Sequence, residues 1–163
     1  MDEPSVQAEG GWQAVLLNFP LIAALIAIVA AQIIKVPIYL VTHRTWNAAL
    51  GFSTGGMPSS HSAAVTSLAA AIGIRDGFSS SLFAIAAIVS AITMFDAMGI
   101  RRHAGIHASI LNQWAKSNPN LSQAGQSRGE LKELLGHRPS EVLAGAIFGV
   151  IVALILHYAL AIR

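Results

Sequence analysis

The chain has 163 residues, of which 54% are hydrophobic and 11% charged, and it contains no cysteine. A water-soluble domain of this length would need more charged side chains to cover its surface, so the composition indicates an integral membrane protein. The lack of cysteine excludes disulfides, thiolate nucleophiles and cysteine-ligated zinc, and a net charge of +2 gives no reason to expect a nucleic-acid partner.

The first spanning helix is predicted from the apolar run at residues 19–41, after an N-terminal tail of residues 1–17. This run is longer than the core of a signal peptide, which predicts a retained helix, and Pro20 fits its first turn. Lys35 interrupts the run. If it faces the interior of a bundle it would bind an anion, whereas near the helix end it would only extend its ammonium group to the interface.

The second predicted helix, Ser60 to Ile74, is short and rich in Ala and Ser, so we expect it inside a bundle rather than against lipid. Ser59 or Ser60 would cap it, and the preceding glycine pair lets the backbone approach a ligand closely. His61 then lies in the first turn, where free N–H groups and the helix dipole favour an anion with which it could exchange a proton. Alone, this motif also fits a capped helix whose histidine merely lies at the interface.

A third span is predicted from Ser81 to Phe95, followed at once by Asp96, Arg101 and Arg102. Charges at a membrane boundary are costly unless they are paired or functional. An arginine here could hold two phosphate oxygens, with Asp96 as its orienting partner. Equally, the two arginines could be a cytoplasmic anchor of the span.

Side chains recur at helical spacing after this boundary, which predicts an amphipathic helix that lies along the membrane surface or roofs the site. Packing or interfacial anchoring explains this stripe better than a cofactor site does. A second interpretation makes Asp96, His103 and His107 ligands of a divalent metal. The residues of the stripe are Ile100, Ala104, His107, Leu111 and Trp114.

The sequence GHRPSEVLAG, at residues 136–145, leads into the last predicted span, Val142 to Ile162. Glu141 follows His137 by four residues and could reach back to its Nδ1–H, which would fix the tautomer and leave Nε2 free as a nucleophile. The plainer alternative is that Glu141 is only a favourable acid at a helix N-terminus.

Within that span, Gly145, Gly149 and Ala153 form a stripe of small residues at a spacing of four. Such a stripe permits close helix packing, either within the chain or between two copies, so a homodimer is compatible with the sequence.

Together these elements predict one all-α membrane domain of about four spans. Residues 18–115 carry the first three spans and the surface helix, residues 116–129 form a polar loop, and residues 130–163 carry the second histidine motif and the last span. This threading brings one set of polar side chains to a single membrane face: Lys35, His61, Asp96 and His137.

The positive charges favour an orientation. Eight of the ten Lys and Arg residues fall on the face with the histidines, and only Arg75 and Arg163 on the other. The positive-inside rule then predicts that the site faces the cytoplasm, with both termini outside. Because an anion site also needs cations, part of this bias has a second explanation.

Four segments at this face, QIIKVP (32–37), GGMPSSHSAAV (55–65), FDAMGIRRHAG (95–105) and LKELLGHRPSEVLAG (131–145), resemble the type-2 phosphatidic acid phosphatase superfamily. The resemblance is strongest to its divergent branch of small bacterial and plant membrane proteins. It implies a phosphatase in the bacterial cytoplasmic membrane that uses neither metal nor cofactor. Its substrate would be a membrane lipid phosphate or an isoprenyl phosphate.

The resemblance also implies roles for single residues. His137 would attack phosphorus and become phosphohistidine, Glu141 would orient it, and His61 would protonate the leaving oxygen and then activate water. The implied phosphate-binding groups are Lys35, Ser59, Ser60, Arg101, Arg102 and Lys132.

The chain departs from the superfamily pattern at several positions. Ser60 replaces a glycine, Glu141 replaces an aspartate, and the arginine expected six residues before the nucleophile is Leu131, with Lys132 adjacent. Nor does Arg44 match the Arg-Pro expected after the motif's lysine. We therefore expect Arg101 and Arg102, oriented by Asp96, to supply the missing positive charge, because a phosphoryl-transfer transition state needs fixed donors.

Two alternatives remain at this stage. The pocket could bind lipid phosphates without cleaving them, as a carrier would, or a metal could assist a membrane hydrolase. The vanadium haloperoxidases of the same superfamily are typically soluble, which argues against that activity for an apolar chain.

Overall fold

The computed structural model describes residues 11–46, 55–117, 131 and 136–161, and within them the chain forms helices and no strand. The all-α membrane bundle predicted from the sequence is confirmed. In chain order the helices are α1 (Trp12–Leu16), α2 (Phe19–His43), α3 (Ser60–Asp76), α4 (Ser81–Met98), α5 (Ile100–Ser117) and α7 (Pro139–Ala161).

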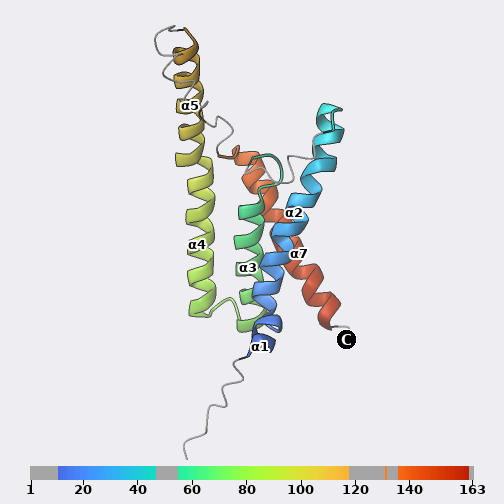
Figure 1. Cartoon of the computed structure of the whole chain (residues 1–163). Helices are drawn as coiled ribbons and strands as arrows, with labels where there is room; N and C mark the ends of the chain where they lie inside the picture. Colours follow the sequence, from blue (N-terminus) through green and yellow to red (C-terminus); the bar gives the residue numbers. More distant parts are fainter. Residues whose placement is uncertain (1–10, 47–54, 118–130, 132–135, 162–163) are drawn as a thin grey trace, which may run out of the picture.

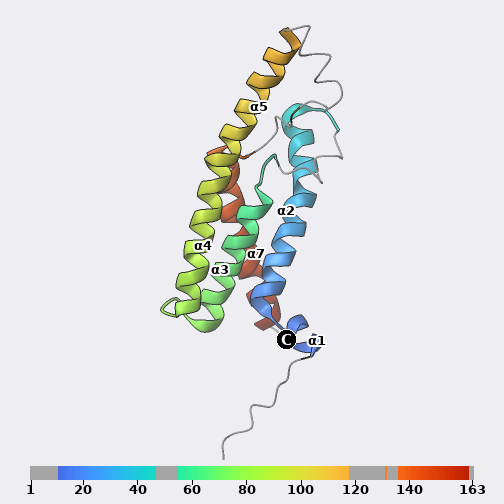
Figure 2. The same cartoon turned by 60° about the vertical axis from the view of Figure 1, so that its left-hand side comes forward.

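Helix α3 is the centre of the bundle. It packs most extensively against α7 and α2 and then against α4, whereas α4 and α7 barely contact each other. Figures 1 and 2 show α3 and α7 beginning at the end where α2 and α4 finish, while α1 and the last turn of α7 lie at the opposite end. The starts of α3 and α7 therefore share one end of the molecule, as the threading predicted.

Polar caps explain where the helices begin. The Asn18 side chain accepts a hydrogen bond from Leu21 N at 3.2 Å ahead of α2, and Pro20 lies in its first turn. Ser80 caps α4 by accepting from Phe83 N at 3.2 Å. Each cap satisfies a backbone N–H that has no partner inside its helix. The short α1 lies in the stretch predicted to be a tail, where the sequence has no comparable signal.

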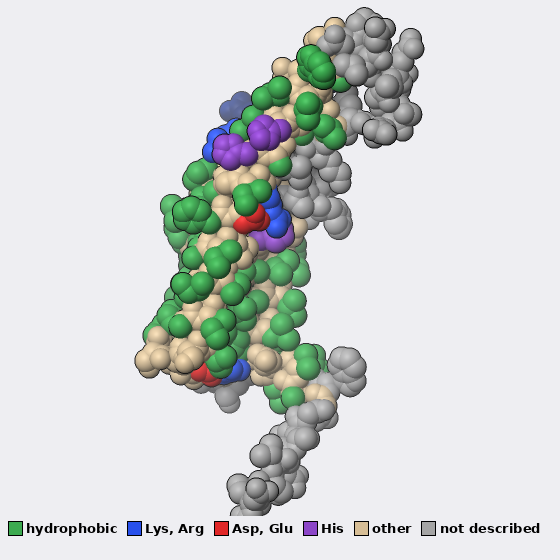
Figure 3. Space-filling model, turned by 90° about the vertical axis from the view of Figure 1, so that its left-hand side faces the viewer, with side chains coloured by type: hydrophobic (Ala, Val, Ile, Leu, Met, Phe, Trp, Pro, Cys, Tyr) green, Lys and Arg blue, Asp and Glu red, His purple; other side chains and the backbone are tan. Residues whose placement is uncertain are grey.

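Among the residues that the structure describes, three helical stretches are long and apolar enough to cross a membrane: Phe19–His43, Ser81–Ser117 and Pro139–Leu160. Their outward surfaces carry exposed aliphatic side chains, such as Val29, Ile88 and Ile155, and Figure 3 shows this apolar surface along α4. The predicted count of about four spans includes α3, which has 17 residues. Its Ala and Ser side chains suit a helix enclosed by the others, as the sequence predicted.

The small-residue stripe of α7 packs within the chain, against α3. A Cβ atom at Gly145 would overlap the backbone of Ser59, and one at Gly149 would overlap that of Ala63. Thr66 Oγ1 also donates to the carbonyl of Ala146 at 3.0 Å. Because the two backbones touch, this contact fixes the start of α7 beside the start of α3.

Helix α5 departs from the prediction. The helix itself is confirmed, but it continues beyond α4 past the break at Gly99 and does not fold over the bundle, so the roofing position is wrong (Figures 1 and 2). Its placement along a membrane surface stays a prediction. The interruption at Gly99 is only one residue long, and neither α4 nor α5 holds a proline to force a turn.

The packed face of α5 is also different from the predicted stripe. Ile100, Leu111 and Trp114 are 74%, 50% and 60% exposed. The buried residues are instead Gly105, Ala108 and Asn112. Small side chains and one amide allow the returning chain to dock there: Leu131 N donates to Asn112 Oδ1 at 3.0 Å, and Asn112 Nδ2 donates to Leu131 O at 2.9 Å. Residues 118–129 of the predicted loop lie outside the described residues.

Candidate active site

The polar end of the bundle joins four segments: the later part of α2, the first turns of α3 and α7, and the junction of α4 and α5 (Figure 1). The four side chains that the sequence placed at one face come from these segments. Figure 3 shows acidic, basic and histidine side chains gathered at the level where α4 passes into α5.

His137 and Glu141 form the predicted pair. His137 Nδ1–H donates to Glu141 Oε2 at 3.0 Å, because an ionised carboxylate can only accept. The same oxygen accepts from the backbone N–H of Arg138 at 3.1 Å, which caps α7. Glu141 therefore makes both contacts that the two interpretations require, one to the ring of His137 and one to the first turn of α7.

The other ring nitrogen of His137 is unusual. The residue is only 4% exposed, and its Nε2 atom is buried with no hydrogen-bond partner in the described part of the chain. Since Nδ1 carries the proton, Nε2 holds a free lone pair. A buried polar atom without a partner costs free energy and requires an explanation, of which a catalytic role is one.

The backbone fixes this histidine against the α4–α5 junction. His137 N donates to Ala97 O at 3.0 Å. Gly136 has φ +81, and a Cβ atom there would overlap the backbone of Arg101 and Arg102. Only glycine meets both demands, so Gly136 allows the chain to turn closely beneath the junction before α7 begins.

Ser59 ties the two helix starts together. Its backbone N donates to Glu141 O at 3.0 Å, and its hydroxyl accepts from Ser62 N at 3.4 Å and Ser62 Oγ at 3.0 Å. Ser59 is therefore the N-cap of α3, and Ser60, which is 4% exposed, is its first helical residue. Both hydroxyls lie at a helix N-terminus that favours an anion.

His61 lies in the first turn of α3, as predicted, and its side chain reaches the surface. Partial burial is the main factor that lowers its pKa below the ordinary value, and the positive charge of Arg101 and the proximity of His137 and Lys35 lower it further. The same interactions place the two histidines in electrostatic range of each other. An anion among these groups would oppose the lowering of the pKa.

Lys35 faces the interior of the bundle. It is 2% exposed, so the alternative of an ammonium group extended to the interface is wrong. Glu141 and His61 are among its charged neighbours. A buried lysine costs free energy unless negative charge compensates it, so this position favours a bound anion.

Asp96 and Arg101 form an ion pair, with Arg101 Nε 2.6 Å from Asp96 Oδ2. The carboxylate therefore orients one of the two candidate arginines. Arg102 is exposed, and the structure places only its backbone against Gly136. Lys132 lies outside the described residues.

The metal alternative is not supported. Within the described ranges no group of three His, Asp or Glu side chains is arranged to hold a metal ion. Asp96, the acidic member of the proposed set with His103 and His107, is bound to Arg101 instead.

Sequence reasoning missed the backbone hydrogen bonds that hold this end together, from His137 to Ala97 and from Ser59 to Glu141. Backbone groups leave no residue-type signal. It also missed Ser62, which is fully buried and donates a hydrogen bond from its hydroxyl to Ser59 Oγ. A serine at the third helical position of a capped helix was the available signal.

Comparisons with known proteins cover all of these groups. The family model described as the Divergent PAP2 family matches residues 16–152. The curated uncharacterized membrane protein YuiD of Bacillus subtilis (strain 168) is 47% identical over 153 residues, which are 88% of this chain and 96% of that protein. No solved structure matches the chain significantly.

Proposed function

This chain belongs to the Divergent PAP2 family, and from that premise we propose that it is a membrane phosphatase that hydrolyses a lipid or isoprenyl phosphate through a phosphohistidine. The observation that carries the proposal is the state of His137: Glu141 fixes its tautomer, and Nε2 is buried without a partner. A structural histidine would have both nitrogens satisfied or in water.

In the first step, the Nε2 lone pair attacks phosphorus and the bond between phosphorus and the lipid oxygen breaks. His61, protonated once the phosphate opposes its positive neighbours, gives its proton to that oxygen. Glu141 stabilises the positive charge that develops on the ring of His137. The products of this step are the free alcohol and a phosphohistidine.

In the second step, neutral His61 takes a proton from water, and the resulting hydroxide attacks phosphorus. The phosphorus–nitrogen bond breaks, inorganic phosphate is formed, and His137 regains its lone pair. His61 thus ends the cycle in the protonation state in which it began.

Lys35, Ser59, Ser60 and Arg101 supply the charge and donors for the phosphate oxygens. Position 131, where the superfamily pattern expects an arginine, is docked on Asn112, which is eleven residues along α5 from Arg101. That spacing is about 16 Å of helix, too far for a side chain at 131 to replace Arg101. Arg102 and Lys132 remain further candidates.

Substrate entry requires movement, because Nε2 is buried. This burial also favours a second candidate function, in which the site binds a lipid phosphate without cleaving it. The two functions differ in one product, inorganic phosphate.

The test is phosphate release by the detergent-purified protein from phosphatidic acid, phosphatidylglycerophosphate and isoprenyl phosphates. We expect release from at least one of them, abolished in His137→Ala. His157→Ala is the matched control, because His157 lies on the same helix beside Phe19 and Tyr158, far along α7 from His137. Binding without release by the native chain would favour the carrier, and equal release by native protein and His137→Ala would reject the nucleophile.

The positive-inside bias of Lys and Arg supports a location in the bacterial cytoplasmic membrane with the site at the cytoplasmic face. A phosphate at that interface would reach the site from the lipid phase. Membrane lipids are then both the solvent and the source of substrate.

A further inference from the structure

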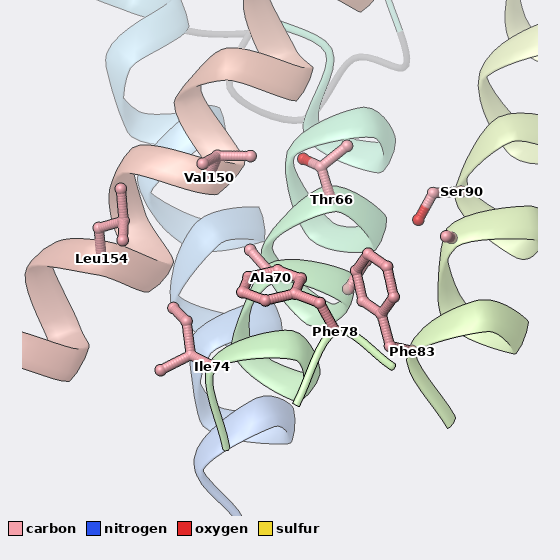
Figure 4. A pocket seen from close by; sticks show the side chains of 10 residues that line it. Thr66, Ala70, Ile74, Phe78, Phe83, Ser90, Val150 and Leu154 are labelled. Carbon is pink, nitrogen blue, oxygen red and sulfur yellow. The ribbon is translucent and has the colours of Figure 1, made fainter. Parts of the chain in front are cut away.

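A groove opens on the face of α3 between α4 and α7. The two flanking helices meet near the bond from His137 to Ala97 and separate from there toward the other end. The space between them is a cavity of about 390 Å³, and Figure 4 shows side chains of all three helices pointing into it. This volume is in the range of small-molecule sites.

The walls of the groove offer no unmet polar group. Its two hydroxyls are already engaged: Thr66 Oγ1 donates to the carbonyls of Ser62 and Ala146, and Ser90 Oγ to those of Ala86 and Val65. The remaining lining side chains are alanine, aliphatic or aromatic. An occupant must therefore be a hydrocarbon, because a polar group would lose its hydrogen bonds there.

Two aromatic rings close the far end. Phe78 and Phe83 meet edge to face with their centroids 5.1 Å apart. Phe78 also covers Gly73, where a Cβ atom would overlap its ring. Figure 4 shows both rings at the end of the groove toward Ile74. We call this pair of rings the floor of the groove; Phe78 contributes one face to it and is 65% exposed.

The groove begins near the candidate active site and runs along α3 toward the opposite end of the bundle. Thr66 and Ile74 follow His61 by five and thirteen residues of α3, which corresponds to about 8 Å and about 20 Å along the helix axis. The His137–Ala97 contact and the cation Arg101, which follows α4, mark one end of this path, and the two aromatic rings mark the other. That distribution of charge and apolar surface is complementary to an anionic amphiphile lying parallel to the spans.

We propose that this groove binds one hydrocarbon chain of the lipid phosphate whose head group occupies the active site, and that Phe78 and Phe83 limit the length of chain that fits. This inference rests on the proposed function for the identity of the head group. The groove opens between spans whose outer surfaces face lipid, so the chain can enter sideways from the bilayer.

Photo-crosslinking tests occupancy without requiring turnover. A phosphatidic acid with a diazirine near the end of one acyl chain is added to the purified protein, with the matching diacylglycerol as the phosphate-free probe. We expect the phosphate probe to label Phe78, Phe83 or Leu154 and unlabelled phosphatidic acid to compete. Equal labelling of the groove by diacylglycerol, or labelling of the outer α4 surface at Ile85 and Ile92 alone, would overturn the proposal.

A filled groove gives the second test. Ala87→Phe places a ring in the cavity, whereas Ile85→Phe, at a position 61% exposed on the same helix, is the matched control. We expect Ala87→Phe to lower kcat/KM for a long-chain lipid phosphate about tenfold and to leave a chainless phosphomonoester unchanged. An equal loss of kcat/KM for both substrates, or no loss for either, would contradict the proposed role of the groove.

Removing one ring of the floor should lengthen the groove. Phe78→Ala should move the preferred chain to a longer member of a lipid-phosphate series, and an unchanged preference would count against the floor. If the native protein releases no phosphate from any member, the proposed function fails, and the labelling pattern alone then decides whether the groove holds the chain.

Discussion

Helices α3 and α7 each begin next to a Pro-Ser pair and a histidine, but the two histidines have different surroundings. His61 follows a serine cap and reaches the surface, with no carboxylate bonded to its ring in the described structure. His137 precedes a proline start, lies 4% exposed and is held by Glu141. The difference arises from the packing of each segment, because the backbone of Gly136 and His137 contacts the α4–α5 junction directly.

That difference is the basis of the proposed chemical roles. A nucleophile needs a fixed tautomer and a free lone pair, which burial and Glu141 give to His137. A group that must lose and regain a proton benefits from contact with water and from a pKa that neighbouring charges can move, which is the situation of His61.

The largest effect is expected at His137. His137→Ala should reduce kcat by about 10³-fold or more with every substrate, because the variant lacks the proposed nucleophile. Steady-state phosphate release measures it, with circular dichroism to show that the helices persist. Residual turnover within tenfold of the native rate would contradict the assignment.

A smaller and substrate-dependent loss is expected at His61. His61→Ala should lower kcat about 10²-fold for an alkyl phosphate, whose leaving oxygen needs a proton. For an aryl phosphate, release of the leaving group in the first turnover should be nearly normal, because an aryl oxide departs without a proton. Comparing the burst of phenol with the loss for the alkyl ester separates the two steps, and identical losses for both esters would argue that His61 serves another purpose.

Glu141→Gln should cost less than removal of either histidine. The amide can still accept from Nδ1–H and from the backbone of Arg138, so the first turn of α7 persists, but the charge that stabilises the ring of His137 is lost. We expect kcat to fall about tenfold or more with little change in thermal stability. A variant as active as the native protein would leave Glu141 with only its helix-capping role.

The smallest effect is on the protonation of His61. Its pKa lies below the ordinary value through partial burial and then through Arg101. Arg101→Gln should therefore raise the pKa of His61, while Arg101→Lys should leave it near its native position because the charge is retained. A histidine-ring NMR titration measures the shift. Superimposable curves for Arg101→Gln and the native protein would mean that Arg101 has no influence on the pKa of His61.

Much of this fold could be predicted because its signals are local. Apolar runs and the caps Ser59 and Ser80 mark the helices, and the spacing of Gly145 and Gly149 marks a close contact. The orientation of His137 by Glu141 was predictable for the same reason, since the two side chains are one helical turn apart.

What could not be predicted depends on tertiary contacts. The period of α5 was clear, but its buried face is set by the docking of Leu131 on Asn112 and not by its largest apolar side chains. In the same way, no residue pattern indicates that Ala97 O receives the N–H of His137 or that Lys35 faces inward. The groove above Phe78 arises because α4 and α7 separate, which is a property of packing angles.

The most direct test of the central claim is to trap the phosphoenzyme. The protein is mixed with lipid phosphate, quenched in alkali, where phosphohistidine persists and phosphoserine esters are lost, and its peptides are sequenced by mass spectrometry. The account predicts phosphate on His137 in the native protein, and more of it in His61→Ala when an aryl phosphate is the donor, because its leaving group needs no proton and only the second step is slowed. Phosphate on His61 instead, or turnover with no phosphohistidine in either protein, would contradict it.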